Sequence, residues 1–135
     1  MLPPLAFGLI QPMPKSDFYT RDNANSGIRM PLLNLDGTLS SDYLTIAGID
    51  SDGFVSANAE AMRSALVIAE IECDETKDKL LRAEKIKLVA SLVIGWSFDE
   101  DATQEAAQQF FTDAPQIMEQ VNSKAAQRNA FIKKK

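Results

Sequence analysis

The stretch Leu92-Val93-Ile94-Gly95-Trp96-Ser97-Phe98, followed at once by Asp99-Glu100-Asp101, decides which kind of fold this chain can form. Its apolar part closes a long helical pattern and holds the only tryptophan, and the acidic part is typical of the start of a helix. A segment of this composition is suited to packing rather than to catalysis. We therefore expect a mostly helical protein that works through its partners.

The length and the net charge limit the classes of protein to which this chain can belong. A chain of 135 residues predicts one domain with a modest core. The formal net charge of −5 argues against a nucleic-acid binder, which normally has a basic surplus. The acidity is uneven, because residues 116–135 hold five basic side chains and one acidic one. We interpret this basic end as a solvated tail.

Cysteine and histidine content excludes several kinds of site. Cys73 is the only cysteine and there is no histidine, so an internal disulfide, a Cys-His nucleophile and a thiol–imidazole zinc site are all excluded. We expect Cys73 to be a partly buried, small apolar residue. The apolar segment 5–10 is crowded by prolines and lacks the basic start of a signal peptide, and no run is long enough for a membrane span. These features predict a cytosolic protein.

The first 50 residues predict an extended arm and a hairpin. Residues 1–53 contain five of the six prolines and five of the six glycines, which favours turns and short strands. We expect an extended arm over 1–15 and a single domain over 16–135. Within that domain, 16–50 is a hairpin and loop region, with strands at 27–35 and 43–49 joined by an Asp36-Gly37 turn.

Residues 51–135 have the pattern of helices. Ser51 or Asp52 can cap a first helix that runs to about Ile71, and Asp74 a longer one that runs to Trp96. A short third helix spans 103–114, and Pro115 opens the fourth. The predicted fold is mainly α, a four-helix C-terminal domain preceded by a small N-terminal β-hairpin and the extended arm.

Two segments resemble sites for chemistry. Asn34-Leu35-Asp36-Gly37-Thr38 is similar to the DxDGT loop of haloacid-dehalogenase-type phosphatases, but Asn34 replaces the nucleophilic aspartate. Asp50-Ser51-Asp52-Gly53 fits part of an EF-hand loop, yet Gly48 and Ala59 occupy two positions that need oxygen ligands. A hairpin turn and a helix N-cap explain these segments better. We predict no catalytic residue, no metal and no cofactor.

The aromatic residues predict a partner surface. A small helical assembly cannot easily bury Trp96, Phe98, Phe110, Phe111 and Phe131 together, so some of them can form an exposed apolar patch. The predicted partner-binding residues are Phe98, Phe110, Phe111, Met118 and Val121.

Two segments together resemble the tail assembly chaperones of long-tailed bacteriophages, the lambda-type family. Residues 42–54, with Gly48, Asp50, Ser51 and Phe54, are similar to the hydrophobic–Gly–x–Asp-Ser–x–x–aromatic segment with which that family begins its first helix. Residues 92–98 are similar to its Leu-Val-x-Gly-Trp signature. The matching residues of this second motif are Leu92, Val93, Gly95 and Trp96. An acidic helix start and a terminal helix follow in the family's order, so the resemblance covers about residues 28–132.

The resemblance implies a non-catalytic function. Such chaperones bind the long, helical tape measure protein, keep it soluble while tail tube subunits polymerise around it, and are absent from the mature virion. Self-association and a location in the host cytoplasm are expected with it. A longer form made by ribosomal frameshifting is also implied, and the codons of Lys133-Lys134-Lys135 could supply an adenine-rich slippery sequence.

Two alternatives remain open from the sequence. One is a structural component of the virion, such as a tail protein or head–tail connector, since these proteins are also small and combine a strand pair with helices. The other is a degenerate phosphatase built on Asp36. Presence in purified virions would favour the first, and activity that depends on Asp36 would favour the second.

Overall fold

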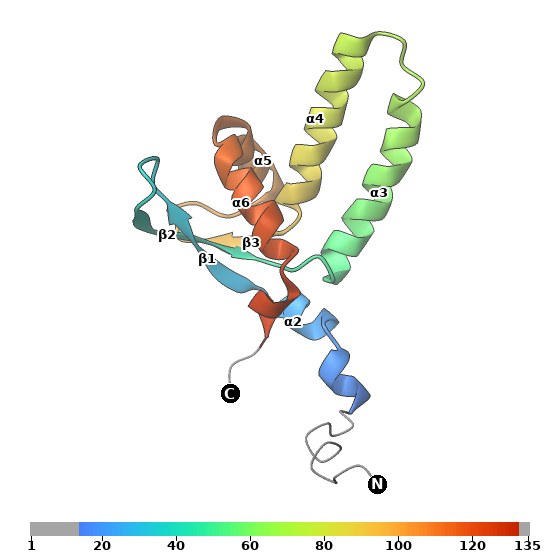
Figure 1. Ribbon diagram of the computed structural model, residues 1–135. Helices are drawn as coiled ribbons and strands as arrows, with labels where there is room; N and C mark the ends of the chain where they lie inside the picture. The colour runs from blue at the N-terminus through green and yellow to red at the C-terminus, as the bar shows by residue number, and fades with distance from the viewer. Residues whose placement is uncertain (1–13, 133–135) are drawn as a thin grey trace, which may run out of the picture.

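The computed structural model describes residues 14–132, which form a mostly helical chain with one small antiparallel sheet (Figure 1). Two 3-10 helices, five α-helices and three strands follow one another in the described part. Their order is η1 (Lys15–Phe18), α2 (Arg21–Ser26), β1 (Ile28–Leu33), β2 (Leu39–Ile46), α3 (Asp52–Ile68), α4 (Asp74–Ala90), β3 (Val93–Trp96), α5 (Gln104–Asp113), α6 (Pro115–Ala125) and η2 (Arg128–Phe131).

The sheet has the order β1-β2-β3, and both pairs of strands are antiparallel. Met30 of β1 lies opposite Leu44 of β2, and Leu44 lies opposite Trp96 of β3. The predicted hairpin turn is confirmed, since the Asp36 carboxylate accepts hydrogen bonds from the Thr38 amide and hydroxyl at 3.0 and 2.7 Å. These bonds lower the pKa of Asp36, with the hydroxyl of Thr38 as the largest cause. Asp36 thus has a structural role in the turn.

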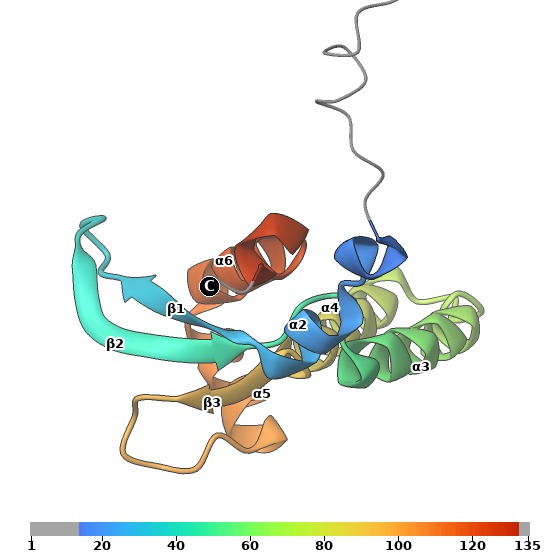
Figure 2. The ribbon, with the colours of Figure 1, turned by 90° about the horizontal axis from the view of Figure 1, so that it is seen from below.

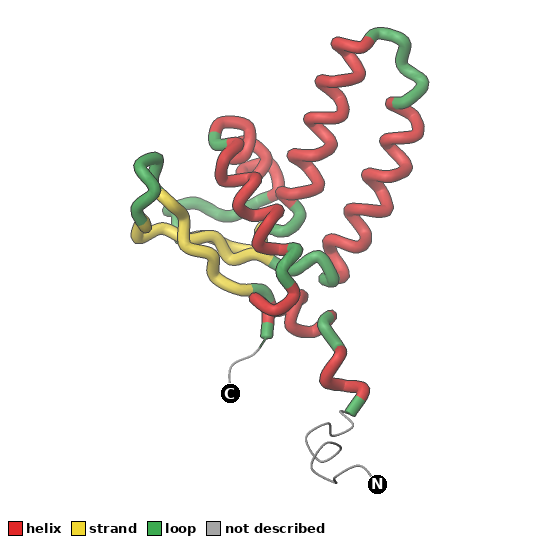
Figure 3. Tube along the Cα trace, viewed as in Figure 1, coloured by secondary structure: helices red, strands yellow, loops and turns green. Residues whose placement is uncertain are grey.

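The structure corrects the predicted extent of the second helix. The helix predicted to run to Trp96 ends at Ala90, and Val93–Trp96 forms strand β3 along the free edge of β2 (Figure 3). The Ser91 hydroxyl donates to the Leu88 carbonyl at the end of α4. The β-branched pair Val93 and Ile94 favours an extended conformation. An apolar run of this length cannot be assigned to helix or strand from periodicity alone.

Helices α5 and α6 lie on one face of the sheet, and α3 and α4 form an antiparallel hairpin that projects from it (Figures 1 and 2). The core lies between the sheet, α5, α6 and the C-terminal end of α4. Its largest fully buried side chains are Leu44, Ile46, Val89, Leu92, Phe111 and Val121. Four α-helices follow residue 51, but β3 separates α4 from α5, so their arrangement as one four-helix domain stays a prediction.

Several boundaries differ from those expected. The segment 16–50 contains the short helices η1 and α2 as well as the hairpin, and most of the predicted arm, 1–13, lies outside the described residues. Helix α3 ends at Ile68 rather than Ile71. Cys73 is exposed, which corrects its predicted burial, because it lies in the distal loop of the α3–α4 hairpin. Pro115 begins α6 as predicted.

Candidate partner-binding site

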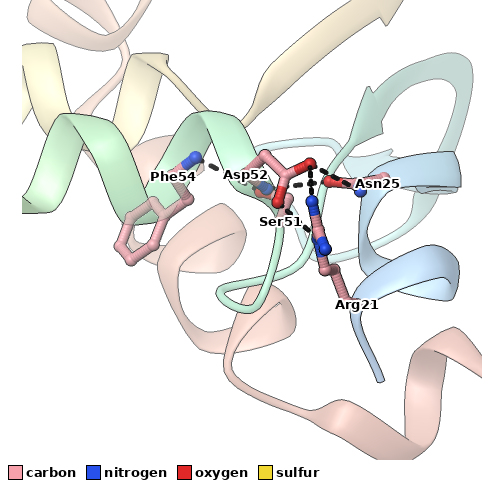
Figure 4. Close-up of polar contacts among 5 residues, drawn as sticks. All are labelled: Arg21, Asn25, Ser51, Asp52 and Phe54. Carbon is pink, nitrogen blue, oxygen red and sulfur yellow. Dashed lines mark hydrogen bonds and ion pairs between the residues drawn. The ribbon is translucent and has the colours of Figure 1, made fainter. Parts of the chain in front are cut away.

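The second half of the first motif, residues 48–54, connects the sheet to α3. Ser51 is 3% exposed, and its hydroxyl accepts a hydrogen bond from the Phe54 amide at 3.3 Å, which confirms the predicted N-cap (Figure 4). The Gly48 amide donates to the Ala24 carbonyl of α2 at 3.0 Å. A Cβ atom on Gly48 would come within 3.0 Å of the Ala24 Cβ, so glycine permits this close approach.

Asp52 binds the first turn of α3 to α2 (Figure 4). Arg21 donates to both oxygens of its carboxylate, at 2.6 and 3.0 Å, and the Asn25 amide donates at 3.2 Å. The Asp52 backbone amide in turn donates to Asn25 Oδ1 at 2.8 Å. The hydrogen bond from Arg21 is the largest cause of the lowered pKa of Asp52.

Asp50 has a similar partner from the other end of the chain. Arg128 of η2 donates to both of its oxygens, at 2.6 and 2.9 Å, and lowers the pKa of Asp50. Asp50 and Asp52 each form an ion pair with an arginine. These ion pairs join parts of the fold, and this structural role accounts for the two aspartates of the EF-hand-like segment. The sequence alone points to neither arginine, since nothing in the spacing links Arg128 to a residue 78 positions away.

The second motif, residues 92–98, contains β3, which lies at one edge of the sheet. Leu92 and Val93 are buried, and the Leu92 carbonyl accepts a hydrogen bond from the Ala47 amide at 2.7 Å. Gly95 lies opposite Thr45, and Trp96 lies opposite Leu44. The strand thereby places the indole of Trp96 at the edge of the core. The motif residues of both segments build the fold around the candidate site.

An aromatic cluster lies where β3 meets α5. Trp96, Phe98 and Phe110 are each half-buried, and their rings meet edge to face. The centroid of Phe98 is 5.3 Å from each of the other two rings, and those of Trp96 and Phe110 are 6.0 Å apart. The Trp96 indole donates to the Glu100 carbonyl at 2.7 Å, which fixes the loop after β3. Such edge-to-face contacts stabilise a defined arrangement of rings.

Two rings of the cluster, Phe98 and Phe110, line a shallow hollow of about 380 Å³. Phe98 and Phe110 supply its apolar wall, and Asp99 and Glu100 supply the acidic one. The arrangement offers an apolar contact beside negative charge. This combination suits the binding of an amphipathic protein segment with basic residues at its edge.

The structure corrects three of the predicted partner-binding residues. Phe111 and Val121 are 0% exposed and Met118 is 6% exposed, so they belong to the core and cannot contact a partner unless the fold opens. Phe110 and Phe111 differ in burial because neighbouring residues on a helix point about 100° apart. Phe98 and Phe110 remain available at the surface. With Trp96 they form the candidate site, which we call the aromatic cluster.

Comparisons of the chain with known protein families, with curated proteins and with solved structures find no match to it. The resemblance to tail assembly chaperones therefore rests on the two motifs themselves. In the described part of the chain, no helix combines the length and the apolar character that crossing a membrane requires.

Proposed function

We propose that this protein is a tail assembly chaperone of a long-tailed bacteriophage, which binds the tape measure protein and keeps it soluble in the host cytoplasm. The two motifs at 42–54 and 92–98 support this function through their resemblance to that family. Recruitment of tail tube subunits, self-association and a frameshifted longer form belong to the same proposal. No catalytic step is part of it.

The two motifs carry the proposal, and the aromatic cluster supports its client-binding part. Partly exposed aromatic side chains supply large contact areas at a small entropic cost, and they dominate many protein interfaces. In this chain Phe98 and Phe110 border a hollow with Asp99 and Glu100 on its rim. A helix of the tape measure protein can place apolar residues on the rings and basic residues beside the carboxylates.

The arrangement of elements is consistent with such a function. We propose that the four helices after residue 51 act as one client-binding domain, to which the hairpin and the N-terminal arm are attached. The acidic net charge of −5 limits non-specific adhesion to other anionic molecules. A chaperone that works by mass action needs many modest contacts along its client, and a half-buried cluster supplies contacts of that strength.

A structural tail or head–tail connector protein is the second candidate. The observation that favours it is the exposed end of the β1–β2 hairpin, where Leu35 and Leu39 are 92% and 70% exposed. A hairpin with apolar residues at its tip can insert between neighbouring subunits of a particle. In that case the protein would remain in the finished virion.

Co-expression with the tape measure protein tests the proposal. We expect a complex in size-exclusion chromatography with light scattering that contains several copies of this chain for each client. Mass spectrometry of purified virions should then detect no copy of the chain. A monomer beside insoluble tape measure protein, together with its presence in virions, would favour the structural candidate instead.

A further inference from the structure

A pocket of about 400 Å³ lies where the two ends of the described chain meet. Figure 1 shows the C-terminal end of the chain beside α2, and η2 is in contact with that helix. The wall of the pocket comes from η1, α2, η2 and the segment before α3. We call it the terminal pocket. Its apolar lining is formed chiefly by Phe18, Tyr19, Ala24, Ile49, Phe131 and Ile132.

The rim of the terminal pocket exposes large apolar side chains. Phe18 and Tyr19, at the end of η1, are 70% and 61% exposed, and Ile132, directly after η2, is 66% exposed. The inner wall is buried, since Ala24 and Phe131 are 3% and 5% exposed. Three large apolar side chains around one pocket form an exposed apolar patch, a feature that commonly marks a binding surface.

The charged groups of the terminal pocket favour an uncharged occupant. Asp50 and Arg128 both line it, and the guanidinium group donates to both carboxylate oxygens, at 2.6 and 2.9 Å, so their charges compensate each other. Asp17 is the remaining charged residue of the described lining, and it is exposed on η1. Because an unpaired charge is costly to bury, an uncharged apolar segment fits this pocket better than a charged one.

The chain supplies such a segment directly before η1. Residues 1–14 contain no charged side chain, and the run 5–10 has the sequence Leu-Ala-Phe-Gly-Leu-Ile. This run lies outside the described residues. The chain from Phe7 to Lys15, where η1 begins, can span up to about 26 Å. This length is enough for the run to fold back onto η1 and reach the pocket.

We propose that the apolar run 5–10 binds in the terminal pocket of the same chain. Its large side chains cover Phe18, Tyr19 and Ile132, and it thereby holds η1, α2 and η2 together. The binding depends on this chain alone and holds whether or not the tape measure protein is its client.

Tethering favours a segment of the same chain over a segment of another molecule. A short tether gives the run an effective concentration in the millimolar range at the pocket. Pro12 and Pro14 lie in this tether and restrict it, which lowers the entropy that binding costs. Even a modest affinity of the run for the pocket is therefore sufficient to keep it bound.

Thiol accessibility tests whether the run occupies the pocket. Ile132→Cys, made in the full chain together with Cys73→Ser, places one thiol at the rim, where a water-soluble maleimide can label it. Adding Phe7→Asp with Leu9→Asp should raise the labelling rate about tenfold, which is the ratio of a millimolar effective concentration to a dissociation constant of ~0.1 mM.

Leu35→Asp with Leu39→Asp is the matched control, because both side chains are exposed at the hairpin and neither lines the terminal pocket. It should leave the labelling rate unchanged, and the far-UV spectra of all variants should agree. A labelling rate that the aspartates at positions 7 and 9 do not raise would overturn the proposal. So would a rise of the same size in the control.

Disulfide formation tests whether the run comes from the same chain. Leu9→Cys with Ile132→Cys, again with Cys73→Ser, should lose both free thiols on oxidation by diamide while the mass remains that of one chain. Leu35→Cys with Ile132→Cys should oxidise at least about tenfold more slowly, because the two thiols do not meet. Equal rates for the two pairs would overturn the proposal. A disulfide that joins only separate chains would also overturn it, since the pocket would then hold the run of a neighbouring molecule.

Discussion

The guanidinium group of Arg128 lies 2.6 and 2.9 Å from the two carboxylate oxygens of Asp50, a residue 78 positions earlier in the chain. Arg128 begins the C-terminal 3-10 helix, and Asp50 stands directly before the cap of α3. The pair therefore closes the C-terminal end of the chain onto the joint between sheet and helical hairpin. Asp50 is the less exposed partner, with 24% of its side chain accessible.

This ion pair predicts a pH-dependent stability. The folded-state pKa of Asp50 lies below its ordinary value of 3.8, chiefly because of Arg128. The stabilisation is complete above pH 3.8 and disappears as the pH falls through the lowered pKa. Asp50→Asn should therefore lower the melting temperature at neutral pH, and the difference from the wild type should shrink below pH 3.8. Thermal melts by circular dichroism across this range measure it.

Asp78→Asn, an exposed substitution on α4, is the charge-matched control for that series. It should leave the melting temperature within the small range typical of surface changes. A penalty for Asp50→Asn that stays constant down to the most acidic pH would contradict the structural role of the carboxylate charge.

The cap of α3 gives a second prediction. Ser51→Ala removes the oxygen that accepts the Phe54 amide hydrogen bond, and it should lower the free energy of unfolding by about 1 kcal/mol. Ser56→Ala, on the exposed face of the same helix, should be neutral or slightly stabilising because alanine favours helix. Urea denaturation of both variants compares them directly, and equal midpoints would argue against the cap.

Two neighbouring phenylalanines should respond differently to truncation. Phe111→Ala removes a fully buried ring, and we expect it to lower the free energy of unfolding by about 3–5 kcal/mol. Phe110→Ala should have a clearly smaller effect, because the ring is half-buried. Its loss removes edge contacts worth about 0.5–1.5 kcal/mol each. Chemical denaturation separates the two, and similar losses would mean that Phe110 also belongs to the core.

Two glycines in the two motifs give a fourth prediction. Gly48→Ala would place a Cβ 3.0 Å from the Ala24 Cβ and 3.3 Å from its Cα, so α2 would have to shift and the melting temperature should fall. At Gly95 the nearest atom to an added Cβ is Thr45 Cβ at 3.6 Å, an ordinary contact. Gly95→Ala should therefore be tolerated. If thermal melts showed the opposite order, the placement of β3 beside Thr45 would be wrong.

The sequence predicts the turn and the helix starts that depend on contacts between residues close together in the chain. The Asp36-Gly37 turn, the Ser51 cap and the Pro115 helix start all depend on hydrogen bonds or backbone angles within a few residues. Thr103, the first residue of the predicted third helix, caps α5 through a local bond of the same kind, since its hydroxyl accepts a hydrogen bond from the Ala106 amide at 3.1 Å.

Strand β3 could not be predicted in the same way. It directly follows a helix and consists of four residues, and its strand conformation depends on hydrogen bonds to β2, which lies about 50 residues earlier. The apolar character of Val93 and Ile94 fits a buried helix end as well as a strand. The partner that decides between them is visible only in the tertiary structure.

The sequence predicts that the aromatic side chains near 96–111 cannot all be buried, and the structure buries Phe111 while Trp96, Phe98 and Phe110 are half-buried against the core. Their role in binding a partner stays a prediction. The sequence does not show which face of α5 meets the sheet, and that orientation separates Phe110 from Phe111. The same limit applies to Met118 and Val121, which the sequence predicts at a partner surface and which lie on the buried face of α6.

Co-expression with the tape measure protein, using variants of the aromatic cluster, tests the central claim most directly. The amount of soluble client that co-elutes with the chain should fall about tenfold or more for Phe98→Ala with Phe110→Ala. It should be unchanged for Phe18→Ala, an exposed aromatic in η1 outside the cluster. Far-UV spectra should show that all variants remain folded. A wild-type chain that leaves the tape measure protein insoluble, or a folded double variant that binds it as well as the wild type, would contradict the account.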